Sequence, residues 1–406
     1  MLKTFKYRIY PKKQQAKILS QQIDECRWLY NHLLAERRDA WKERQASLSY
    51  YDQATEIPPL KEHRPSLKMV HSQVLQNVAV RLDLAMKAFF RRMKECEKEA
   101  GYPRFRGKNR YDSLTFPQVP VGCKVDGRTL IVSKVGTLKM VYHRPIEGTP
   151  KTATIRRMPT GKWFVTISCE WEPTPLPPTH QDVGIDVGLK TFAFLSDGQE
   201  IAHPRFFRQE EKSLAKAQRK HAKAVDAHKA KRAEVTKQMK HEHPEMDASQ
   251  VWQLVNQNKE EQSTWKERQK RRKVVARTHE RTRWRRENFT HQQSRHIINQ
   301  FDVIAVEDLS VNRMMHNHCL ANSIADAAWR QFAELLHIKA EWAARTYIAV
   351  NPAYTSQNCS GCGHRNSDLS LADRVYHCDC CGLVIDRDLN AAINILALGR
   401  QCLLSS

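Results

Sequence analysis

Long apolar runs are absent from this 406-residue sequence. No stretch of about 18 consecutive apolar residues occurs, so a membrane-spanning helix is not expected. The first ten residues, MLKTFKYRIY, also lack the apolar segment of a secretory signal peptide. We therefore expect a cytoplasmic protein whose eleven cysteines are thiols or metal ligands and do not form disulfides.

Acidic residues are few relative to basic ones, with 44 Asp and Glu against 67 Lys and Arg and a net charge of +23. Such an excess is typical of proteins that neutralise a polyanion, most commonly nucleic acid. About half of it lies in residues 205–287, which contain 24 Lys and Arg against 12 Asp and Glu. This segment is helical in pattern and polar on every side, so it either lies along a polyanion or is a solvated coiled-coil face. The nucleic-acid contacts predicted there are Arg271, Arg272, Lys273, Arg283, Arg285 and Arg286.

Four cysteines near the C-terminus have the spacing of a zinc site. Cys359 and Cys362 form one Cys-x-x-Cys-Gly pair, and Cys378 and Cys381 form another after fifteen residues. Each pair suits a tight knuckle, because its glycine accepts a backbone conformation that other residues resist. The spacing predicts a four-thiolate zinc ribbon.

Three carboxylates are candidates for a second metal site. Asp186 lies within an apolar strand, where a charge is costly unless it is paired or binds metal. Glu307 ends another apolar strand, and Asp388 begins an Ala- and Leu-rich helix after the ribbon. A strand-end turn and a helix N-cap are the ordinary alternatives for these last two. Together the three acids fit a site for two Mg²⁺ ions, roughly 3.5–4 Å apart, that cleaves phosphodiesters.

The segment from Gly101 to Lys108 interleaves aromatic and cationic side chains. Such a pattern suits stacking on bases together with contacts to phosphates, although an ordinary turn with exposed cations is equally compatible. The residues predicted to contact nucleic acid here are Tyr102, Arg104, Phe105, Arg106 and Lys108.

The first half of the chain changes its hydrophobic period twice. Residues 1–10 alternate as a strand, and about residues 12–100 are helical, with a proline-containing loop expected over 50–67. Short strands between 130 and 167 then indicate a small barrel or sandwich, which the first strand is expected to join. A proline-rich linker follows at 173–180.

The second half alternates strands with helices. A strand containing Asp186 enters a hairpin, residues 301–306 form a buried strand, and a helix is expected over about 324–345 before a further strand at 347–350.

The sequence resembles the TnpB family along nearly its whole length. Members of this family are nucleases encoded by bacterial and archaeal insertion sequences and are related to compact type V CRISPR effectors. The most specific motifs are Val306-Glu-Asp-Leu309, Pro352-Ala-Tyr-Thr-Ser-Gln357, Asp386-Arg-Asp-Leu-Asn-Ala-Ala392 and the cysteine pairs, and the match also includes Gly184-Ile-Asp-Val-Gly188. Weaker matches include Arg8-Ile-Tyr-Pro11 and Gly101-Tyr-Pro-Arg-Phe105.

The resemblance implies a multidomain α+β fold. It comprises an RNase-H-like (RuvC) α/β nuclease domain with an inserted zinc ribbon, and a small β-barrel wedge domain that carries a helical recognition insert. The implied bounds are 1–11 and 101–172 for the wedge domain, 12–100 for the recognition domain, 173–180 for the linker, 181–357 and 383–406 for the nuclease domain with its basic helical segment at 205–290, and 358–382 for the ribbon.

The resemblance also implies an activity: RNA-guided, Mg²⁺-dependent DNA endonuclease of an insertion sequence. Its catalytic acids map onto Asp186, Glu307 and Asp388, the last preferred to Asp386 because it directly precedes Leu-Asn-Ala-Ala. The implied partners are a guide RNA from the element's end, double-stranded DNA beside a short adjacent motif, and the displaced single strand. The implied location is the prokaryotic cytoplasm at the nucleoid, without a membrane; the oligomeric state is not indicated.

Other functions stay open from the sequence alone. A guide-directed DNA-binding repressor would not need the three acids, whereas a guide-free nuclease and a compact type V CRISPR effector would. A transposase lacks support, because no Tyr or Ser recombinase constellation is present. Residues 234–266 depart from the family pattern and suit an added helical hairpin that contacts RNA or a second protomer.

Overall fold

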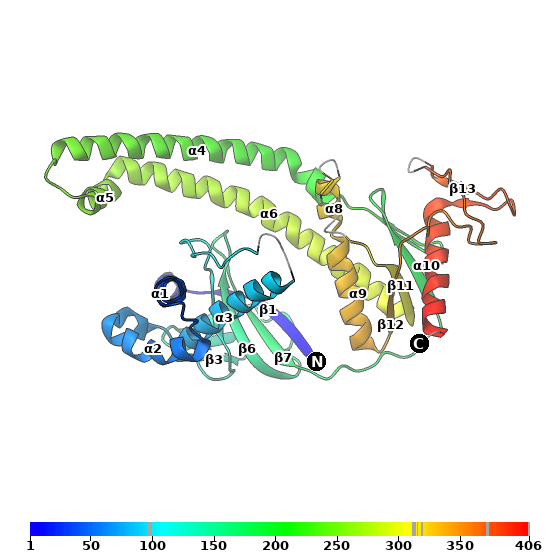
Figure 1. The fold of residues 1–406 in the computed structure, drawn as a ribbon, viewed down its shortest axis with the longest axis horizontal. Coiled ribbons are helices and arrows are strands. Elements are labelled where there is room, and N and C mark those ends of the chain that lie inside the picture. The colour runs from blue at the N-terminus through cyan, green and yellow to red at the C-terminus, as the bar shows by residue number, and fades with distance from the viewer. Residues whose placement is uncertain (96–99, 311–313, 315, 318–319, 371–372, 405–406) are drawn as a thin grey trace. The chain divides into compact units, whose positions relative to one another are not determined.

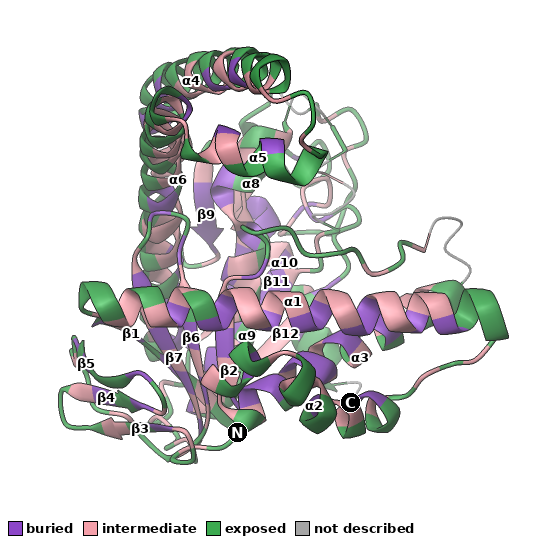
Figure 2. Ribbon diagram, turned by 90° about the vertical axis from the view of Figure 1, so that its left-hand side faces the viewer, coloured by how far each residue is buried: buried purple, intermediate pink, exposed green. Residues whose placement is uncertain are grey.

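The computed structural model describes residues 1–95, 100–310, 314, 316–317, 320–370 and 373–404. The chain divides into two compact units, Met1–Glu172 and Pro173–Ser406. Figure 1 shows the elements of both units as a ribbon, and Figure 2 shows how far each residue is buried. Among the described helices, none combines the length and the apolarity that a membrane crossing requires.

The first unit contains a seven-stranded antiparallel sheet in the order β2-β6-β7-β1-β5-β4-β3. The first strand joins it as the alternation of residues 1–10 suggests, because β1 pairs with both β7 and β5. β2 and β3 end the order, so the described pairings leave the expected barrel open between them. The strands are β1 (Leu2–Tyr10), β2 (Ser113–Phe116), β3 (Cys123–Asp126), β4 (Thr129–Val132), β5 (Gly136–Met140), β6 (Thr149–Arg157) and β7 (Trp163–Glu170).

Three α-helices and a short 3₁₀ helix pack with this sheet. They are α1 (Lys13–Arg44), α2 (Tyr50–His63), the 3₁₀ helix η1 (Pro65–Met69) and α3 (Ser72–Lys94). Their apolar stripes belong to the same hydrophobic core as the sheet, in which Leu33 of α1, Leu82 of α3 and Val165 of β7 are all fully buried. The helical segment and the strands therefore share one core within this unit.

The expected loop over residues 50–67 is wrong, because most of this segment is helical. Ser49 and Asp52 cap α2 reciprocally: the Asp52 amide donates to Ser49 Oγ at 3.3 Å, and the Ser49 amide donates to Asp52 Oδ2 at 2.7 Å. Buried Gln53 donates to the Leu33 carbonyl at 2.8 Å and accepts from Arg37. These tertiary contacts stabilise a helix that its two internal prolines would disfavour in isolation.

The second unit is built on a five-stranded mixed sheet in the order β10-β9-β8-β11-β12. β11 is parallel to β8 and β12, whereas β8, β9 and β10 are antiparallel. The strands are β8 (Asp182–Val187), β9 (Thr191–Leu195), β10 (Glu200–Ala202), β11 (Val303–Glu307) and β12 (Thr346–Val350). Helix α9 (Trp329–Ala343) and the end of α6 cover one face, and α10 (Arg387–Leu404) covers the other (Figure 1).

A long helical hairpin extends from this sheet. It consists of α4 (Phe206–Glu242), α5 (Ala248–Gln257) and α6 (Lys259–Gln300), with α4 and α6 side by side (Figures 1 and 2). A small apolar cluster around Val235, Val251 and Val255 holds α5 at the tip. Between the long helices the contact is largely polar: Arg232 Nη1 lies 2.7 Å from Glu261 Oε1, and both Glu261 and His228 are buried. A short helix, α8 (Ala321–Ala327), precedes α9.

Candidate active site and metal centre

Adjacent parallel strands place two of the predicted acids side by side. Ile185 of β8 pairs with Val306 of β11, and both are buried in the core on the α9 face. Because side chains alternate between the two faces of a strand, the following residues, Asp186 and Glu307, are directed to the α10 face. The strand ends therefore bring these two carboxylates to one edge of one face.

Two glycines allow α10 to lie close against that face. A Cβ on Gly184 would meet the Ala392 carbonyl oxygen at 2.1 Å, and a Cβ on Gly399 would meet Ala305 Cβ at 2.6 Å. Any larger residue at either position would displace the helix from β8 or β11. This close packing fixes where the first turn of α10, with its own carboxylate, lies along the strands.

Asp386 and Asp388 have different roles at the start of α10. Asp386 Oδ1 accepts hydrogen bonds from the amides of Asp388 and Leu389 at 2.8 and 3.2 Å, so Asp386 caps the helix. The Asp388 carboxylate is not needed as a cap and is close enough to Asp186 to perturb its ionisation. This division agrees with the choice of Asp388 for the candidate site.

The pKa of Asp186 responds to its burial and to the two other acids. Burial, and then the negative charges of Glu307 and Asp388, raise the pKa of Asp186 to about 7. Arg387 and the Val187 amide act in the opposite direction. Burial also raises the pKa of Glu307, which a hydrogen bond from Thr355 partly offsets. A bound cation would stabilise the ionised form of Asp186 in such a position.

The acids lie farther apart than the ribbon cysteines do. Among the described residues, the four ribbon cysteines are the His, Cys, Asp or Glu group whose ligand atoms all lie within 4.8 Å of one another. The three carboxylates do not form such a group, so their oxygens do not all lie within 4.8 Å of one another.

Thr355 was not predicted as a site residue, yet it contacts one of the acids directly. Its hydroxyl donates to Glu307 Oε1 at 2.5 Å, and its carbonyl accepts from Asn394 Nδ2 of α10 at 2.9 Å. Thr355 is buried. The only signal in the sequence is its place in the Pro352–Gln357 motif, because the contact joins residues far apart in the chain.

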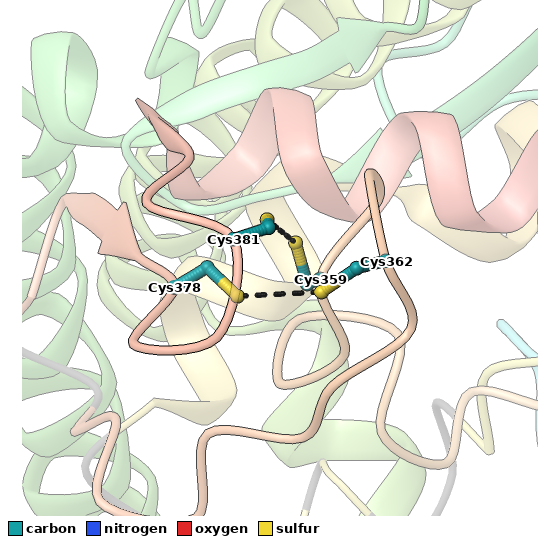
Figure 3. Close-up of side chains that lie close together, drawn as sticks. All are labelled: Cys359, Cys362, Cys378 and Cys381. Atoms are coloured by element: carbon teal, nitrogen blue, oxygen red, sulfur yellow. Dashed lines mark hydrogen bonds between the residues drawn. The ribbon is translucent and has the colours of Figure 1, made fainter.

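The four predicted metal-ligating cysteines converge (Figure 3). The Sγ atoms of Cys359 and Cys381 lie 3.6 Å apart, and those of Cys362 and Cys378 lie 3.5 Å apart. A tetrahedral zinc ion with bonds of about 2.3 Å separates its sulfur ligands by about 3.8 Å, so the geometry fits zinc. The amides of Cys381 and Cys380 help to lower the pKa of Cys378 to about 6, whereas burial and the neighbouring thiols raise the pKa of Cys362 to about 12. A bound metal would deprotonate such coordinating thiols.

The backbone of the ribbon follows the expected knuckles. Gly363 and Gly382, which follow the two cysteine pairs, have φ angles of +77° and +75°, which other residues rarely adopt. A two-stranded sheet of β13 (Val375–His377) and β14 (Val384–Asp386) supports the second pair.

Buried Asn390 ties the ribbon to α10. Its Nδ2 donates to the Asn358 carbonyl at 2.8 Å, and its Oδ1 accepts from the Ser360 amide at 2.9 Å. Asn394, one turn later, also donates to the Asn358 carbonyl, at 2.7 Å. The cysteine knuckle is thereby fixed to the helix that carries Asp388.

In the first unit, the predicted nucleic-acid residues lie along α1 and α3. Phe105 stacks under the Arg38 guanidinium, the Arg106 amide donates to Asn31 Oδ1 at 2.7 Å, and Tyr102 meets Phe89 edge-on. All of the predicted residues here are exposed: Tyr102, Arg104, Phe105, Arg106 and Lys108. Their role as nucleic-acid contacts stays a prediction.

The predicted cations of α6 differ in how far they are neutralised. Arg271 pairs with Glu267 at 2.6 Å, Arg283 with Glu287 at 3.4 Å, and Arg285 with Glu210 at 3.3 Å. Arg286 donates to the Ala325 carbonyl, and Lys273 is exposed. Arg272 is half-buried. Contacts of these six residues with nucleic acid likewise stay predictions.

Known families and proteins resemble this chain along nearly its whole length. Residues 166–247 and 235–318 match a family described as a probable transposase, and residues 329–395 match the TNB domain of Cas12f1-like proteins. Residues 1–46 match a family described as a helix-turn-helix domain, although in the structure this region is strand β1 followed by the single helix α1.

Two relatives cover almost all of the chain. A putative RNA-guided DNA endonuclease of Streptomyces pristinaespiralis is 32% identical over 402 residues, which are 98% of this chain and 89% of the relative. The putative RNA-guided DNA endonuclease InsQ of Escherichia coli K12 is 27% identical over 99% of this chain and 93% of its own length. A solved structure of the mini-RNA-guided endonuclease CRISPR-Cas_phi3 aligns with 98% of this chain and 92% of its own, at 12% identity and a TM-score of 0.47.

Proposed function

This chain belongs to the TnpB family of insertion-sequence proteins, and we propose that it is an RNA-guided DNA endonuclease. One observation supports the cleavage site most directly. Asp186 and Glu307 lie near the ends of neighbouring strands with their side chains directed to the α10 face, and the tight packing of α10 at Gly184 supports a position of Asp388 beside Asp186. Such a trio suits phosphodiester hydrolysis with two Mg²⁺ ions.

The residues of the site would have three different roles: metal binding, orientation of a metal ligand, and structural support. Asp186, Glu307 and Asp388 would hold the ions, whose bound form supplies an activated water and stabilises the leaving oxygen. Thr355 would keep Glu307 oriented by donating to Oε1, so that the other carboxylate oxygen stays available. The ribbon cysteines would hold a structural Zn²⁺ and take no part in the chemistry.

The remaining parts of the chain would bind nucleic acid. In this proposal the first unit contains the wedge domain (1–11 and 101–172) and the recognition domain (12–100). The second unit contains the RuvC-like domain and the ribbon. Base pairing by a guide RNA would select double-stranded DNA beside a short adjacent motif, and the protein would hold the displaced strand. The net charge of +23 supports binding of such polyanions in the cytoplasm, at the nucleoid.

The site assignment is tested by replacing Asp186. We expect Asp186→Ala to abolish cleavage of a plasmid that carries the guide's target, while binding of the target is retained. Asp197→Ala is the matched control, because Asp197 lies in the β9–β10 turn of the same sheet and contacts Gln199. Full cleavage by Asp186→Ala would refute the site.

The guide requirement is tested separately on the wild-type protein. RNA that co-purifies with the chain is sequenced, and its spacer-like end is exchanged for a sequence that matches a new plasmid. Cleavage should move to the new target. A nuclease that needs no guide would cut both plasmids equally, with or without RNA.

A further inference from the structure

One face of α6 carries a row of exposed cations beside an exposed tryptophan. Lys266, Lys270, Lys273 and Arg277 are spaced by four, three and four residues, so they share one face of the helix. Trp265 lies at the edge of this face and is 46% exposed. These five residues are called the α6 stripe below.

The charge of the α6 stripe is not compensated. None of its four cations makes an ion pair with a residue that the structure describes. Elsewhere on the hairpin, Arg271 pairs with Glu267 and Arg232 pairs with Glu261, whereas an exposed face of α4 also lacks ion pairs among the described residues: Lys216, Arg219, Lys220 and Lys223. Unpaired cations along one face are available to an external polyanion, and the tryptophan beside them distinguishes the α6 stripe from the α4 face.

The α6 stripe also forms a groove. Its residues, together with Gln269 and Val274, line an open groove of about 570 Å³. The indole of Trp265 and the exposed side chain of Val274 supply apolar surface between the charges. An aromatic platform flanked by cations is how proteins bind single-stranded nucleic acid, because bases stack on the ring while phosphates meet the charges.

The position of the α6 stripe separates it from the cleavage site. Arg277 is its residue nearest to the sheet, and roughly 35 Å of helix lie between Arg277 and the end of α6 at Gln300. Glu307 lies beyond, at the end of β11. The nucleotides bound on the stripe are therefore not those whose phosphate would lie among the three acids.

We propose that the α6 stripe binds an unpaired segment of the guide RNA, with a base stacked on Trp265 and successive phosphates on the four cations. The inference rests on the proposed function. In that function the target strand pairs with the guide and a DNA strand must reach the acids. The part of the guide that does not pair with DNA is free to occupy a distant single-strand site throughout the reaction.

The test measures binding of a defined RNA to the full chain. RNA that co-purifies with the wild-type protein is sequenced, transcribed and bound in filter assays over a range of salt. The variant Lys266→Ala/Lys270→Ala/Lys273→Ala/Arg277→Ala should lower the slope of log affinity against log salt by about 3, since each single-strand phosphate contact contributes about 0.7. Trp265→Ala should weaken binding by between about five- and about a hundredfold, and Trp265→Phe should retain most of it.

Matched controls come from the same hairpin. Lys216, Arg219, Lys220 and Lys223 form an exposed cationic face of α4, a helix without a tryptophan, so their fourfold Ala variant removes the same charge from a face that lacks its own aromatic platform. Trp252 of α5 is 60% exposed, and Trp252→Ala removes an exposed indole outside the stripe. Both controls should bind the RNA within about twofold of the wild type, and circular dichroism should show unchanged helix content in all variants.

The contrary outcomes are distinct. If RNA binds the wild type and the stripe variants equally well, the stripe assignment is wrong while the proposed function stands. If the variants keep the RNA but lose affinity for target DNA, the stripe holds DNA and the inference is overturned. If the wild-type protein retains no RNA, the proposed function itself fails.

Discussion

The hydroxyl of Thr355 donates to the candidate catalytic carboxylate of Glu307, and its removal can be tested without altering the acid. Thr355→Val keeps the side-chain shape but leaves Glu307 Oε1 without its donor. Residues that orient a metal ligand typically contribute 10- to 100-fold to metal affinity or activity, so we expect a cleavage loss of about that size. The rate should recover partly at high Mg²⁺.

Thr355→Ser is the informative companion, because it restores the donor without the methyl group. It should cleave at close to the wild-type rate, with a similar Mg²⁺ requirement. If Val and Ser variants are equally impaired, packing of Thr355 matters and the hydrogen bond does not.

The two aspartates at the start of α10 should separate stability from chemistry. Asp386→Ala removes a helix cap that accepts from two amides, so it should lower the free energy of unfolding by about 1 kcal/mol while cleavage largely persists. Asp388→Ala should abolish cleavage and leave stability nearly unchanged. Thermal melting and plasmid cleavage, measured on both proteins, check this pair, and an exchange of the two phenotypes would move the catalytic role to Asp386.

Individual site residues differed in how well the sequence could predict them. Asp186 is conspicuous because a carboxylate within an apolar strand is costly, and the cysteines are conspicuous by their spacing. Thr355 and Asn394 carry no such local signal. Thr355 contacts Glu307, 48 positions away, and Asn394 contacts Thr355, 39 positions away. Both contacts depend on where the ribbon loop meets α10.

At the scale of elements, period-two alternation predicted strands such as β1 and β7, since burial alternates along both. Helix boundaries were less predictable where tertiary contacts decide them. The helix expected over 324–345 is broken at Ala328, whose φ is +56°. Just before the break, Asp326 accepts hydrogen bonds from the Phe207 amide at the start of α4, a contact that the local sequence does not indicate.

The free energy of unfolding should depend on pH through Lys339, which lies where α9 packs on α6. Its Nζ donates to the His291 carbonyl at 2.6 Å and to Ser294 Oγ at 2.7 Å, and burial lowers its pKa to about 8. In the unfolded chain the pKa is about 10.4, so between these values the unfolded state binds more protons and the lysine's destabilising effect declines as pH rises.

We therefore expect Lys339→Met to gain stability relative to the wild type below about pH 8, and to lose that advantage progressively towards pH 10. Urea unfolding of both proteins at pH 7, 8, 9 and 10 measures the difference. Arg330→Met, at an exposed position of the same helix, is the control and should show no such trend. A constant difference between Lys339→Met and the wild type would contradict the proton linkage.

At the scale of the whole molecule, local sequence patterns predicted individual helices, strands and motifs but not the packing between elements that are far apart in the chain. The cysteine cluster could be predicted from sequence, because its ligands lie within one short segment, whereas the role of the strand-borne acids stays a prediction. The shared core of helices and sheet in the first unit could not, because it requires α1 and α3 to pack on strands far along the chain. The α6 stripe was visible only in part, since ion pairs such as Arg271–Glu267 remove some cations from the predicted set.

The zinc ribbon contacts the helix that carries Asp388, so removal of the zinc should lower the cleavage rate indirectly. Asn390 and Asn394 bind the Asn358 carbonyl next to Cys359, and α10 also carries Asp388. Structural zinc contributes directly to folding free energy. Cys378→Ser should therefore lose the single zinc expected per chain, melt at a lower temperature and cleave more slowly, because a loosened ribbon no longer holds the start of α10 in place.

Cys402→Ser, at an exposed cysteine outside the ribbon, should match the wild type in zinc content, melting and cleavage. If Cys378→Ser kept full zinc occupancy and melted like the wild type yet lost cleavage, the cysteine would act in the chemistry and the structural assignment of the ribbon would be wrong.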